Sequence, residues 1–528
     1  MVPLTLSATA RRESPVRRTV GASAIATINL AVKIGSNFVI IPLALRYLGR
    51  EEYAVWIILQ SIAVYLTMSE LGIGQSLLNF QNVAFAKGEH DQVNRFLTTG
   101  FGLSCLIAIP VWVVFVFVLL TQPVATWLLR DVPPSSVTVF EWYLFLAGTL
   151  ALWRVPLFAL PATLLGLRET ILRQLLDGAY AVFLLVGTVL TLVLHGELLA
   201  LILVTNLGFI FITLLSYPLA RSRHAEVHLA RRFWTPALMW PLLANSSFFF
   251  LYNLGLLFQR LAGNLLAGKF GLLRQVPEMF VLLTLFRVVG WSLADIASQT
   301  LQPYIIRLPV QGRQDRVVFF AKLCTKFTFA LAMVYAALIW LFADIGMRLW
   351  LGPGMFLGYR HLACLGGAFL MEVMFLSTNN FMRGLNRHRR LSVVMAGYAV
   401  LSFVLGIAGA KWWAPDDPLF GLCVGLLVAS FLGQALPLPW VTYRWLQIGW
   451  RRYFQHFIIR PGFLAVCGIG ILIGFAVAGG SGVWNRVAGG LAVVVVLPLL
   501  AWFVVLDREE REWMSRLAGN FKLLESED

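Results

Sequence analysis

Residues 490–506 read GLAVVVVLPLLAWFVVL, and residues 110–120 read PVWVVFVFVLL. Both stretches are apolar on every face of a helix, so neither has the polar side that a surface helix of a soluble protein turns toward water. Helices of this kind need lipid or other protein on all sides. The two stretches therefore predict helices that cross a membrane.

The composition extends this prediction to the whole chain. Of its 528 residues, 59% are hydrophobic and 13% are charged, whereas about a quarter of the residues in a soluble domain are charged. Windows of about 20 apolar residues predict an all-α polytopic membrane protein with about fourteen transmembrane helices joined by short loops. The predicted spans lie near residues 20–45, 53–80, 96–120, 138–164, 171–194, 197–219, 240–267, 277–302, 321–343, 357–381, 391–412, 417–441, 457–479 and 486–506.

A weak internal repeat divides these spans into two related halves. AKGEHDQVNRF at 86–96 parallels PVQGRQDRVVFF at 309–320, and ATLLGLRETILRQLLD at 162–177 parallels NNFMRGLNRHRRLSVV at 379–394. Hydrophobic helices that end in Gly and Arg can look alike by chance, but here the features recur in the same order. The repeat predicts two six-helix lobes with a central cleft, followed by two further helices.

The predicted organisation has six parts. They are a cytoplasmic basic N-terminus at 1–19, an N-lobe of spans 1–6 at 20–219, a basic cytoplasmic linker at 220–239, a C-lobe of spans 7–12 at 240–441, spans 13 and 14 at 442–506, and a cytoplasmic tail at 507–528.

The net charge of +16 comes from Lys and Arg residues that are concentrated on one predicted side of the membrane. Roughly 29 Lys and Arg residues fall in the termini and alternate loops on one face, about 9 on the other face and about 4 inside spans, which predicts that the first face and both termini are cytoplasmic. The basic character is thus explained by topology and contact with anionic membrane lipids, and nucleic acid is not an expected partner. The N-terminal apolar run is long enough to remain as a span, so we expect no cleaved signal peptide.

Four basic residues fall inside predicted spans: Lys33, Arg154, Arg260 and Arg287. Each would cost about 2.5–3.5 kcal/mol at the centre of a lipid-facing helix, so we expect all four to line water or a partner. Two come from each half, and guanidinium groups suit bidentate phosphate binding. They are the predicted substrate-binding residues of a cleft that takes an anionic, phosphate-bearing substrate.

Four intramembrane acids leave an alternative open: Glu70, Asp177, Asp295 and Glu372. Each cation could simply pair with one of them, although four buried pairs without function would be an expensive way to join helices. The acids are also candidates for proton or cation sites that couple transport to an ion gradient.

Enzyme chemistry finds little support in the sequence. There is no GxxxxGK[ST] phosphate loop. The five cysteines are far apart without metal-ligand spacing, and HAEVH at 224–228 lies in a basic loop with no further ligand cluster. We expect no catalytic residues, no metal site and no cofactor.

The segment FVIIPLALRYLGREEYAVWIILQSIAVYLTMSELGIGQSLLNF at 38–80 resembles the Wzx-type polysaccharide flippases of the multidrug, oligosaccharidyl-lipid and polysaccharide exporter superfamily. AKGEHDQVNRF and NNFMRGLNRHRR look like further features of that family. The resemblance implies a MATE-like fold in a bacterial inner membrane. One departure is LFQRLAGNLLAG at 257–268, where an acidic residue would be expected near the end of span 7 and Arg260 stands instead.

The resemblance also implies a function. Such proteins are expected to move isoprenoid-pyrophosphate-linked oligosaccharide from the cytoplasmic to the periplasmic leaflet by alternating access, for exopolysaccharide or O-antigen synthesis. A polysaccharide polymerase and a chain-length regulator are the expected protein partners. Two alternatives are a drug or cation antiporter of the same superfamily, whose cavity should be acidic and apolar, and a membrane glycosyltransferase or polysaccharide polymerase.

Overall fold

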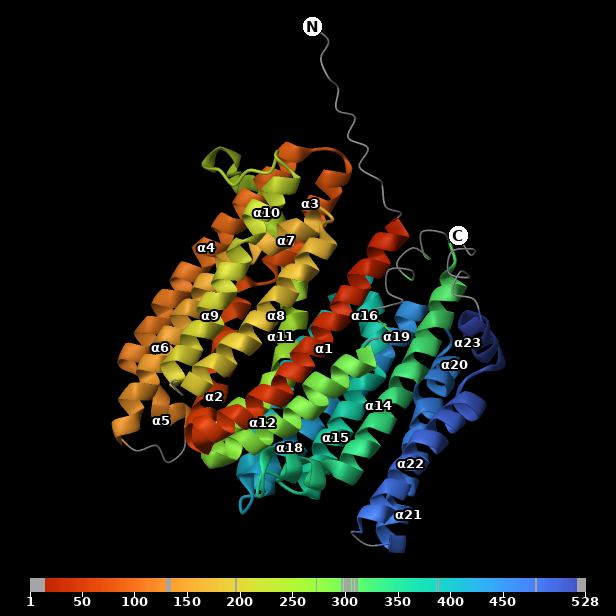
Figure 1. Ribbon diagram of the computed structural model, residues 1–528. Coiled ribbons are helices and arrows are strands. Elements are labelled where there is room, and N and C mark those ends of the chain that lie inside the picture. Colours follow the sequence, from red (N-terminus) through yellow and green to blue (C-terminus); the bar gives the residue numbers. More distant parts are fainter. Residues whose placement is uncertain are drawn as a thin grey trace.

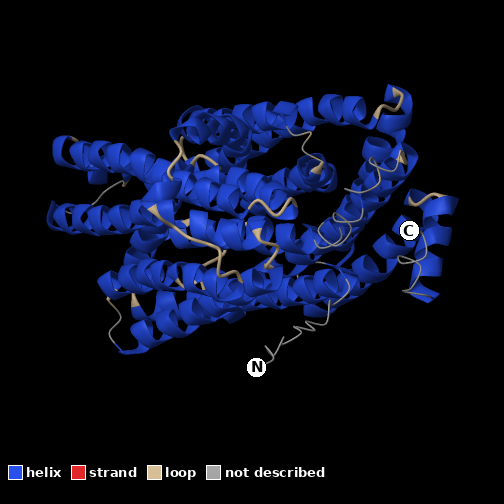
Figure 2. Ribbon diagram, turned by 90° about the horizontal axis from the view of Figure 1, so that it is seen from above, coloured by secondary structure: helices blue, strands red, loops and turns tan. Residues whose placement is uncertain are grey.

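The computed structural model describes residues 15–129, 134–194, 197–271, 273–295, 298, 305, 308, 312–385, 387, 389–479 and 482–519. Every regular element within these residues is helical (Figure 2). Fourteen of the helical segments are long and apolar enough to cross a membrane. The predicted all-α polytopic fold with about fourteen spans is therefore confirmed, and we number these spans 1–14 in chain order.

The N-lobe contains spans 1–6, which form the red to yellow part of Figure 1. Several spans are built from two helices in succession. Its helices are α1 (Pro15–Tyr47), α2 (Gly49–Thr67), η1 (Met68–Glu70), α3 (Ile73–Ala86), α4 (His90–Thr121), α5 (Val124–Leu128), α6 (Pro134–Leu157), α7 (Ala159–Gly166), α8 (Thr170–Leu194), α9 (Leu198–Leu214) and α10 (Ser216–Arg223).

The C-lobe contains spans 7–12. Its helices are α11 (Met239–Phe270), α12 (Val276–Thr284), η5 (Leu285–Gly290), α14 (Gln314–Leu351), α15 (Tyr359–Met374), α16 (Leu376–Gly384), α17 (Arg389–Ala408), η6 (Gly409–Trp413), α18 (Pro418–Ser430), η7 (Phe431–Ala435) and α19 (Pro437–Leu446). The connection between the lobes carries the short turns η2 (Arg231–Phe233) and η3 (Pro236–Leu238), and η4 (Leu273–Gln275) precedes α12.

Spans 13 and 14 form the blue hairpin beside α14 in Figure 1. They consist of α20 (Trp450–Phe454), η8 (Gln455–Ile459), α21 (Arg460–Gly479), α22 (Val483–Leu500) and η9 (Ala501–Val505), and α23 (Arg508–Gly519) follows them. We call the end of the molecule at which α1 begins and α3 ends the basic end, because the loops predicted to be cytoplasmic lie there.

Broken spans are a feature of both lobes. Span 2 is interrupted after η1, where Gly72 has a φ of +78°. A Cβ on Gly72 would lie 2.9 Å from the carbonyl oxygen of Ser246 in α11, so glycine is required both by the left-handed backbone and by the close approach of the lobes. Span 8 widens into the π-helical turn η5, and spans 4 and 10 are interrupted after Leu157 and Met374. Interrupted spans are tolerated in membranes where protein or a polar cavity satisfies the backbone.

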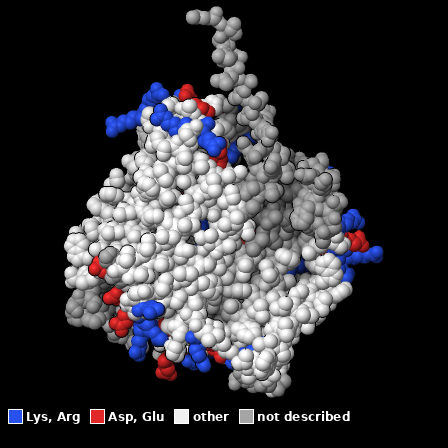
Figure 3. Space-filling model, viewed as in Figure 1, with Lys and Arg blue, Asp and Glu red and all other residues white. Residues whose placement is uncertain are grey.

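Charged side chains gather at the two ends of the molecule and around α23, and a broad uncharged belt lies between them on the face seen in Figure 3. A belt of this kind fits a bilayer around the molecule. Many large apolar side chains on the span surfaces are exposed, including Phe117 at 65% and Val466 at 69%. The belt thus agrees with the spans identified by length and composition.

Ion pairs hold spans 13 and 14 to the C-lobe at both of their ends. At the basic end, the ammonium of buried Lys326 in α14 lies 3.1 Å from Asp507 and 2.7 Å from Glu510. Burial alone would raise the pKa of the Asp507 carboxyl, but Lys326 and the guanidinium of Arg460 hold that pKa below its usual value. At the opposite end, Arg486 pairs with Asp344 of α14. The hairpin is thus anchored to one helix of the C-lobe.

Candidate functional site

A cavity of about 810 Å³ lies between the lobes toward the basic end. Small-molecule sites span about 300–1,000 Å³, so its size suits a large polar group. The N-lobe contributes side chains from α3, along most of its length, and from the start of α8. The C-lobe contributes the start of α11, the end of span 8 and the end of α16. The lining residues are Gln75, Asn79, Phe80, Val83, Thr170, Gln174, Asn245, Phe249, Asp295, Asn380, Arg383 and Gly384.

Amide side chains dominate the polar part of this lining. Gln75, Asn79 and Gln174 come from the N-lobe, and Asn245 and Asn380 from the C-lobe. Each amide offers both donors and acceptors, which matches the hydroxyl groups of a sugar. The cavity therefore suits a neutral or mildly anionic polyhydroxyl group.

The charged side chains of the cavity lie on its C-lobe wall. The guanidinium of Arg383 lies over the ring of Tyr252, with 4.5 Å between its carbon and the ring centroid. Asn380 donates a hydrogen bond to Asp295. Arg260 is exposed and lies close enough to Asp295 and Arg383 for electrostatic interaction. Arg383 and Asp295 thus line this wall, and Arg260 lies near them outside the lining, with its guanidinium over the ring of Trp291.

The lobes are joined at the end opposite to the basic end. Arg50 of α2 lies 3.1 Å from the carboxylate of Glu278 in α12, and the Glu278 side chain is 4% exposed. The indole N–H of Trp350 in α14 donates to the carbonyl oxygen of Phe38 in α1 at 2.8 Å. These contacts close the space between the lobes on the far side of the cavity. We call the pair of Arg50 and Glu278 the inter-lobe ion pair.

Lys33 lies on α1 and is exposed. The neighbouring acid, Asp177 of α8, pairs with Arg173 one turn earlier at 2.8 Å. Lys33 interacts with Asp177 electrostatically. These charges sit on the N-lobe side. Of their two helices, α8 contributes to the cavity lining and α1 does not, and none of the three charged residues is among the lining residues.

Arg154 lies inside the N-lobe and is half-buried. One guanidinium nitrogen donates to Asn206 at 3.3 Å, and its carbon lies 3.7 Å from the centroid of the Phe209 ring. Its Nε has no hydrogen-bond partner. Tyr180 lies close enough for electrostatic interaction, while its hydroxyl donates to the Thr205 carbonyl at 3.3 Å. Within the described residues, Arg154 makes no ion pair with a carboxylate.

Arg287 lies in η5 and is fully enclosed by the C-lobe. Its guanidinium lies 2.8 Å from the carboxylate of Glu372, and both side chains are at most 2% exposed. The same carboxylate oxygen accepts hydrogen bonds from Tyr398 at 3.1 Å and Ser430 at 2.9 Å, and Arg287 also donates to the carbonyl of Gln259. For Arg287, the alternative of pairing with an intramembrane acid is the observed one. Neither member of the pair faces the cavity.

Glu70 occupies the break in span 2. Its carboxylate accepts hydrogen bonds from the backbone N–H of Gly72, at 3.1 Å, and from that of Gly74. These N–H groups belong to the first turn of α3, whose positive dipole end favours a carboxylate. Glu70 thus satisfies the backbone where the helix restarts. Among the four predicted acids, only Asp295 lies in the cavity lining.

The lobes repeat one turn closely enough to match positions between them. After span 4, the backbone N–H of Leu167 donates to Thr163 at 2.9 Å, and after span 10 that of Leu385 donates to Phe381 at 3.0 Å. A glycine precedes the leucine in both turns. The leucine of each turn therefore serves as the reference position from which residues of the two lobes are matched.

Opposite charges occupy one pair of matched positions. Arg154 precedes Leu167 by as many residues as Glu372 precedes Leu385. Tyr180 and Tyr398 likewise follow their respective leucines by equal numbers of residues. Both lobes thus place a charged side chain of the earlier helix beside a tyrosine of the next. The charge is positive in the N-lobe and negative in the C-lobe.

Two features of the site were missed by the sequence analysis. Arg383 was counted among the basic residues of the cytoplasmic face, but it stands on the cavity wall because α16 extends beyond it. The inter-lobe ion pair joins Arg50 and Glu278, which lie in the first turns of α2 and α12. Arg50 and Arg383 lie outside the predicted spans 53–80 and 357–381, and Glu278 stands at the very start of the span predicted at 277–302, so none of the three was singled out as a charge within a span.

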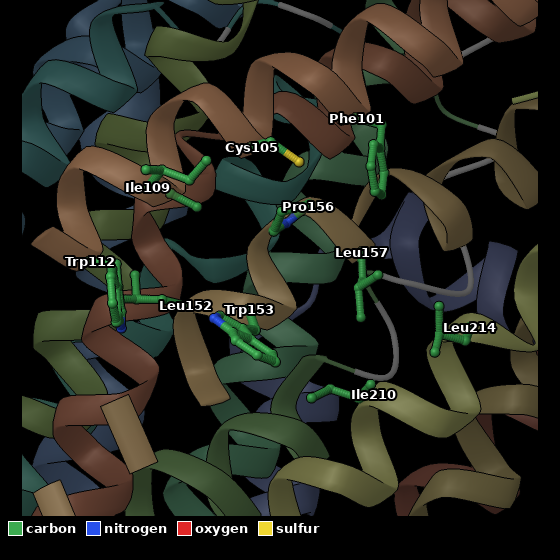
Figure 4. Close-up of a pocket in the computed structure, with 11 residues that line it drawn as sticks. Phe101, Cys105, Ile109, Trp112, Leu152, Trp153, Pro156, Leu157, Ile210 and Leu214 are labelled. Carbon is green, nitrogen blue, oxygen red and sulfur yellow. The ribbon is translucent and has the colours of Figure 1, made fainter. Parts of the chain in front are cut away.

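A second hollow lies on the outer side of the N-lobe, between α4, α6 and α9 (Figure 4). Its volume is about 370 Å³, and apolar side chains such as Phe101, Trp112 and Leu152 line it. Trp153 at its rim is 64% exposed. This hollow offers no charged side chain and faces the predicted lipid belt, so it does not suit a polar headgroup.

No protein-family model and no curated protein sequence matches the chain. Solved structures do match it. The lipid II flippase MurJ in an inward closed conformation superposes with a TM-score of 0.64 at 10% identity, over 92% of this chain and 99% of that chain. An inward-facing MATE family transporter of the MOP superfamily gives a TM-score of 0.62 at 13% identity, over 79% of this chain and 99% of that chain.

A MOP superfamily transporter from Pyrococcus furiosus, described by the reverse polarity of its binding pocket, gives a TM-score of 0.56 at 14% identity, over 83% of this chain and 98% of that chain. At such identities the likeness establishes the fold. The chain thus has the fold of these transporters, as the sequence predicted.

Proposed function

We propose that the protein is a flippase that moves a lipid-linked oligosaccharide with a pyrophosphate group across a bacterial inner membrane. The observation that carries this proposal is the amide-rich cavity of about 810 Å³ between the lobes, near the basic end. A sugar chain can exchange its hydrogen bonds with water for bonds to these amides. The isoprenoid tail remains in the lipid, where it loses no hydrophobic stabilisation.

Cations of the cavity wall supply the site for the pyrophosphate. Arg383 lines this wall and Arg260 lies near it outside the lining. Guanidinium groups form bidentate, charge-assisted hydrogen bonds with phosphate oxygens. Asp295 offsets part of their charge, which weakens binding enough for release. Arg154 and Lys33 on the N-lobe side join them as the lobes change their relative position. Arg287, the fourth cation of the predicted set, is held by Glu372 and takes no part.

The contacts at the far end support alternating access as the mechanism. In the present arrangement the inter-lobe ion pair and the Trp350–Phe38 hydrogen bond close that end. Rupture of these contacts, with closure of the cavity at the basic end, would carry the headgroup to the other side. The fold match to a MATE transporter leaves the drug antiporter as the second candidate, but the amide-rich cavity favours the oligosaccharide.

The direct test removes the gene and locates the lipid-linked oligosaccharide. Accumulation on the cytoplasmic leaflet is expected, and accumulation on the periplasmic leaflet would contradict a flippase. It would instead point to a later step such as polymerisation.

A residue-level test uses export in the deletion strain as its measure. Arg383→Gln removes a cavity cation and should lower export about tenfold or more at equal protein abundance. Arg221→Gln, which changes an exposed arginine of α10, is the matched control and should export normally. Equal export by both variants would remove Arg383 from the site.

A further inference from the structure

A third hollow lies away from the cleft, on the outer side of the C-lobe at the basic end. Its volume is about 780 Å³, and it separates the start of α17 from α19. Arg389 and Arg390 line it together with Trp440. The remaining lining residues are Val393, Val394, Pro437 and Val441.

Aromatic rings hold the arginines around this hollow. The guanidinium carbon of Arg389 lies 5.2 Å from the centroid of the Phe248 ring, and that of Arg390 lies 6.0 Å from the ring centroid of Trp440. Arg444, near the end of α19, approaches the same indole at 4.0 Å. A cation–π contact positions a guanidinium but leaves its N–H donors free for other partners.

No carboxylate neutralises these arginines within the described part of the chain. Neither Arg389, Arg390 nor Arg444 forms an ion pair with an acidic side chain there, whereas Arg360 and Arg486 at the opposite end both do. Two positive charges therefore line the hollow, and a third, Arg444, contacts the indole of Trp440 that lines it, without an acidic ion-pair partner among the described residues. An anion of matching shape would complete the arrangement.

The hollow is polar at its rim and apolar below it. Arg389 and Arg390 begin α17 and Arg444 lies in the last turn of α19, so all three charges sit where the spans reach the basic end. Val393 lies one turn deeper and is 58% exposed. This order of charge and hydrocarbon matches the order of phosphate and acyl chain in a phospholipid of the inner leaflet.

We propose that this hollow is a binding site for an anionic phospholipid, separate from the transport cleft. The phosphate lies among Arg389, Arg390 and Arg444, and an acyl chain lies along Val393 and its neighbours between α17 and α19. Arginines that merely reach for the membrane surface would not need a shared hollow or a common indole. The site would fix the C-lobe in the inner leaflet while the N-lobe moves.

Native mass spectrometry of the purified full chain tests this site. Wild-type protein should retain phosphatidylglycerol in preference to phosphatidylcholine. The variant Arg389→Gln/Arg390→Gln/Arg444→Gln should bind phosphatidylglycerol about tenfold more weakly, because each cation near an anionic headgroup contributes to binding. The control Arg221→Gln/Arg223→Gln removes two exposed arginines of α10 and should bind like wild type.

Three outcomes would overturn the proposal. They are equal retention of phosphatidylglycerol by the triple variant, equal retention of phosphatidylcholine by wild type, and loss of the bound lipid to millimolar inorganic phosphate, which would identify a phosphate site alone. If the triple variant fails to fold, a benzophenone amino acid in place of Val393 gives an independent readout. It should crosslink to anionic phospholipid in native membranes, and crosslinking to phosphatidylethanolamine alone would contradict the proposal.

Discussion

The N-lobe and the C-lobe place a charged side chain at the same position of spans 4 and 10, but they use it differently. In the C-lobe, Glu372 is neutralised by Arg287 and bonded to Tyr398 and Ser430. In the N-lobe, Arg154 has an amide and an aromatic face as its neighbours. The two lobes therefore have a charge at matched positions, but its sign and its pairing differ between them.

The difference separates two reasons for charge inside a membrane. A buried pair with further hydrogen bonds holds helices in register and is costly to break. A half-buried cation without a carboxylate partner is retained only where water, another polar group or a bound anion interacts with it. We infer that the C-lobe charge is structural and that the N-lobe charge serves the transported anion.

The largest expected effect comes from breaking the C-lobe pair. Arg287→Met leaves the Glu372 carboxylate buried without its partner, which costs about 3–5 kcal/mol in the free energy of unfolding. Unfolding of the purified protein in detergent by chemical denaturant measures it. The double variant Arg287→Met/Glu372→Leu should recover most of the loss, since no charge then remains buried. A single variant as stable as the double would show that the pair is not structural.

A smaller loss of stability is expected in the N-lobe. Arg154→Met removes one hydrogen bond and one cation–π contact, together worth about 1–2 kcal/mol, and leaves no buried acid behind. The same denaturant titration measures it. A loss as large as that of Arg287→Met would mean that Arg154 has a structural partner after all, and the contrast between the lobes would fail.

The smallest effect is expected at the contact that joins the lobes. Arg50→Ala breaks the inter-lobe ion pair, which is partly exposed and worth about 1 kcal/mol or less, so the population of the present arrangement should fall about fivefold at most. The labelling rate of Asn79→Cys in the cleft by a water-soluble maleimide reports it and should decrease. Arg360→Ala, which breaks the Arg360–Asp417 pair within the C-lobe, is the control. An equal response to both changes would argue against a role in closure.

The sequence predicted the architecture well because hydrophobic length and turn chemistry are local properties. The spans and the two lobes follow from apolar windows and from the repeated glycine turns. The sequence did not predict which charged side chains pair. The pairing of Arg287 with Glu372 depends on the rotation of spans 8 and 10 about their axes, and η5 changes that rotation. Of the predicted residues, Asp295 lines the cavity and Arg260 lies near it outside the lining, while Arg383 was missed because it stands near a loop.

The most direct test of the difference between the N-lobe charge and the C-lobe charge is the transport rate of two reconstituted variants. Proteoliposomes containing Arg154→Gln should translocate lipid-linked oligosaccharide at least about tenfold more slowly than wild type, whereas Arg287→Met/Glu372→Leu should retain most of the wild-type rate at equal protein incorporation. The reverse result, with Arg154→Gln active and the double variant inactive, would contradict the account, because the charge that serves transport would then be the buried pair of the C-lobe.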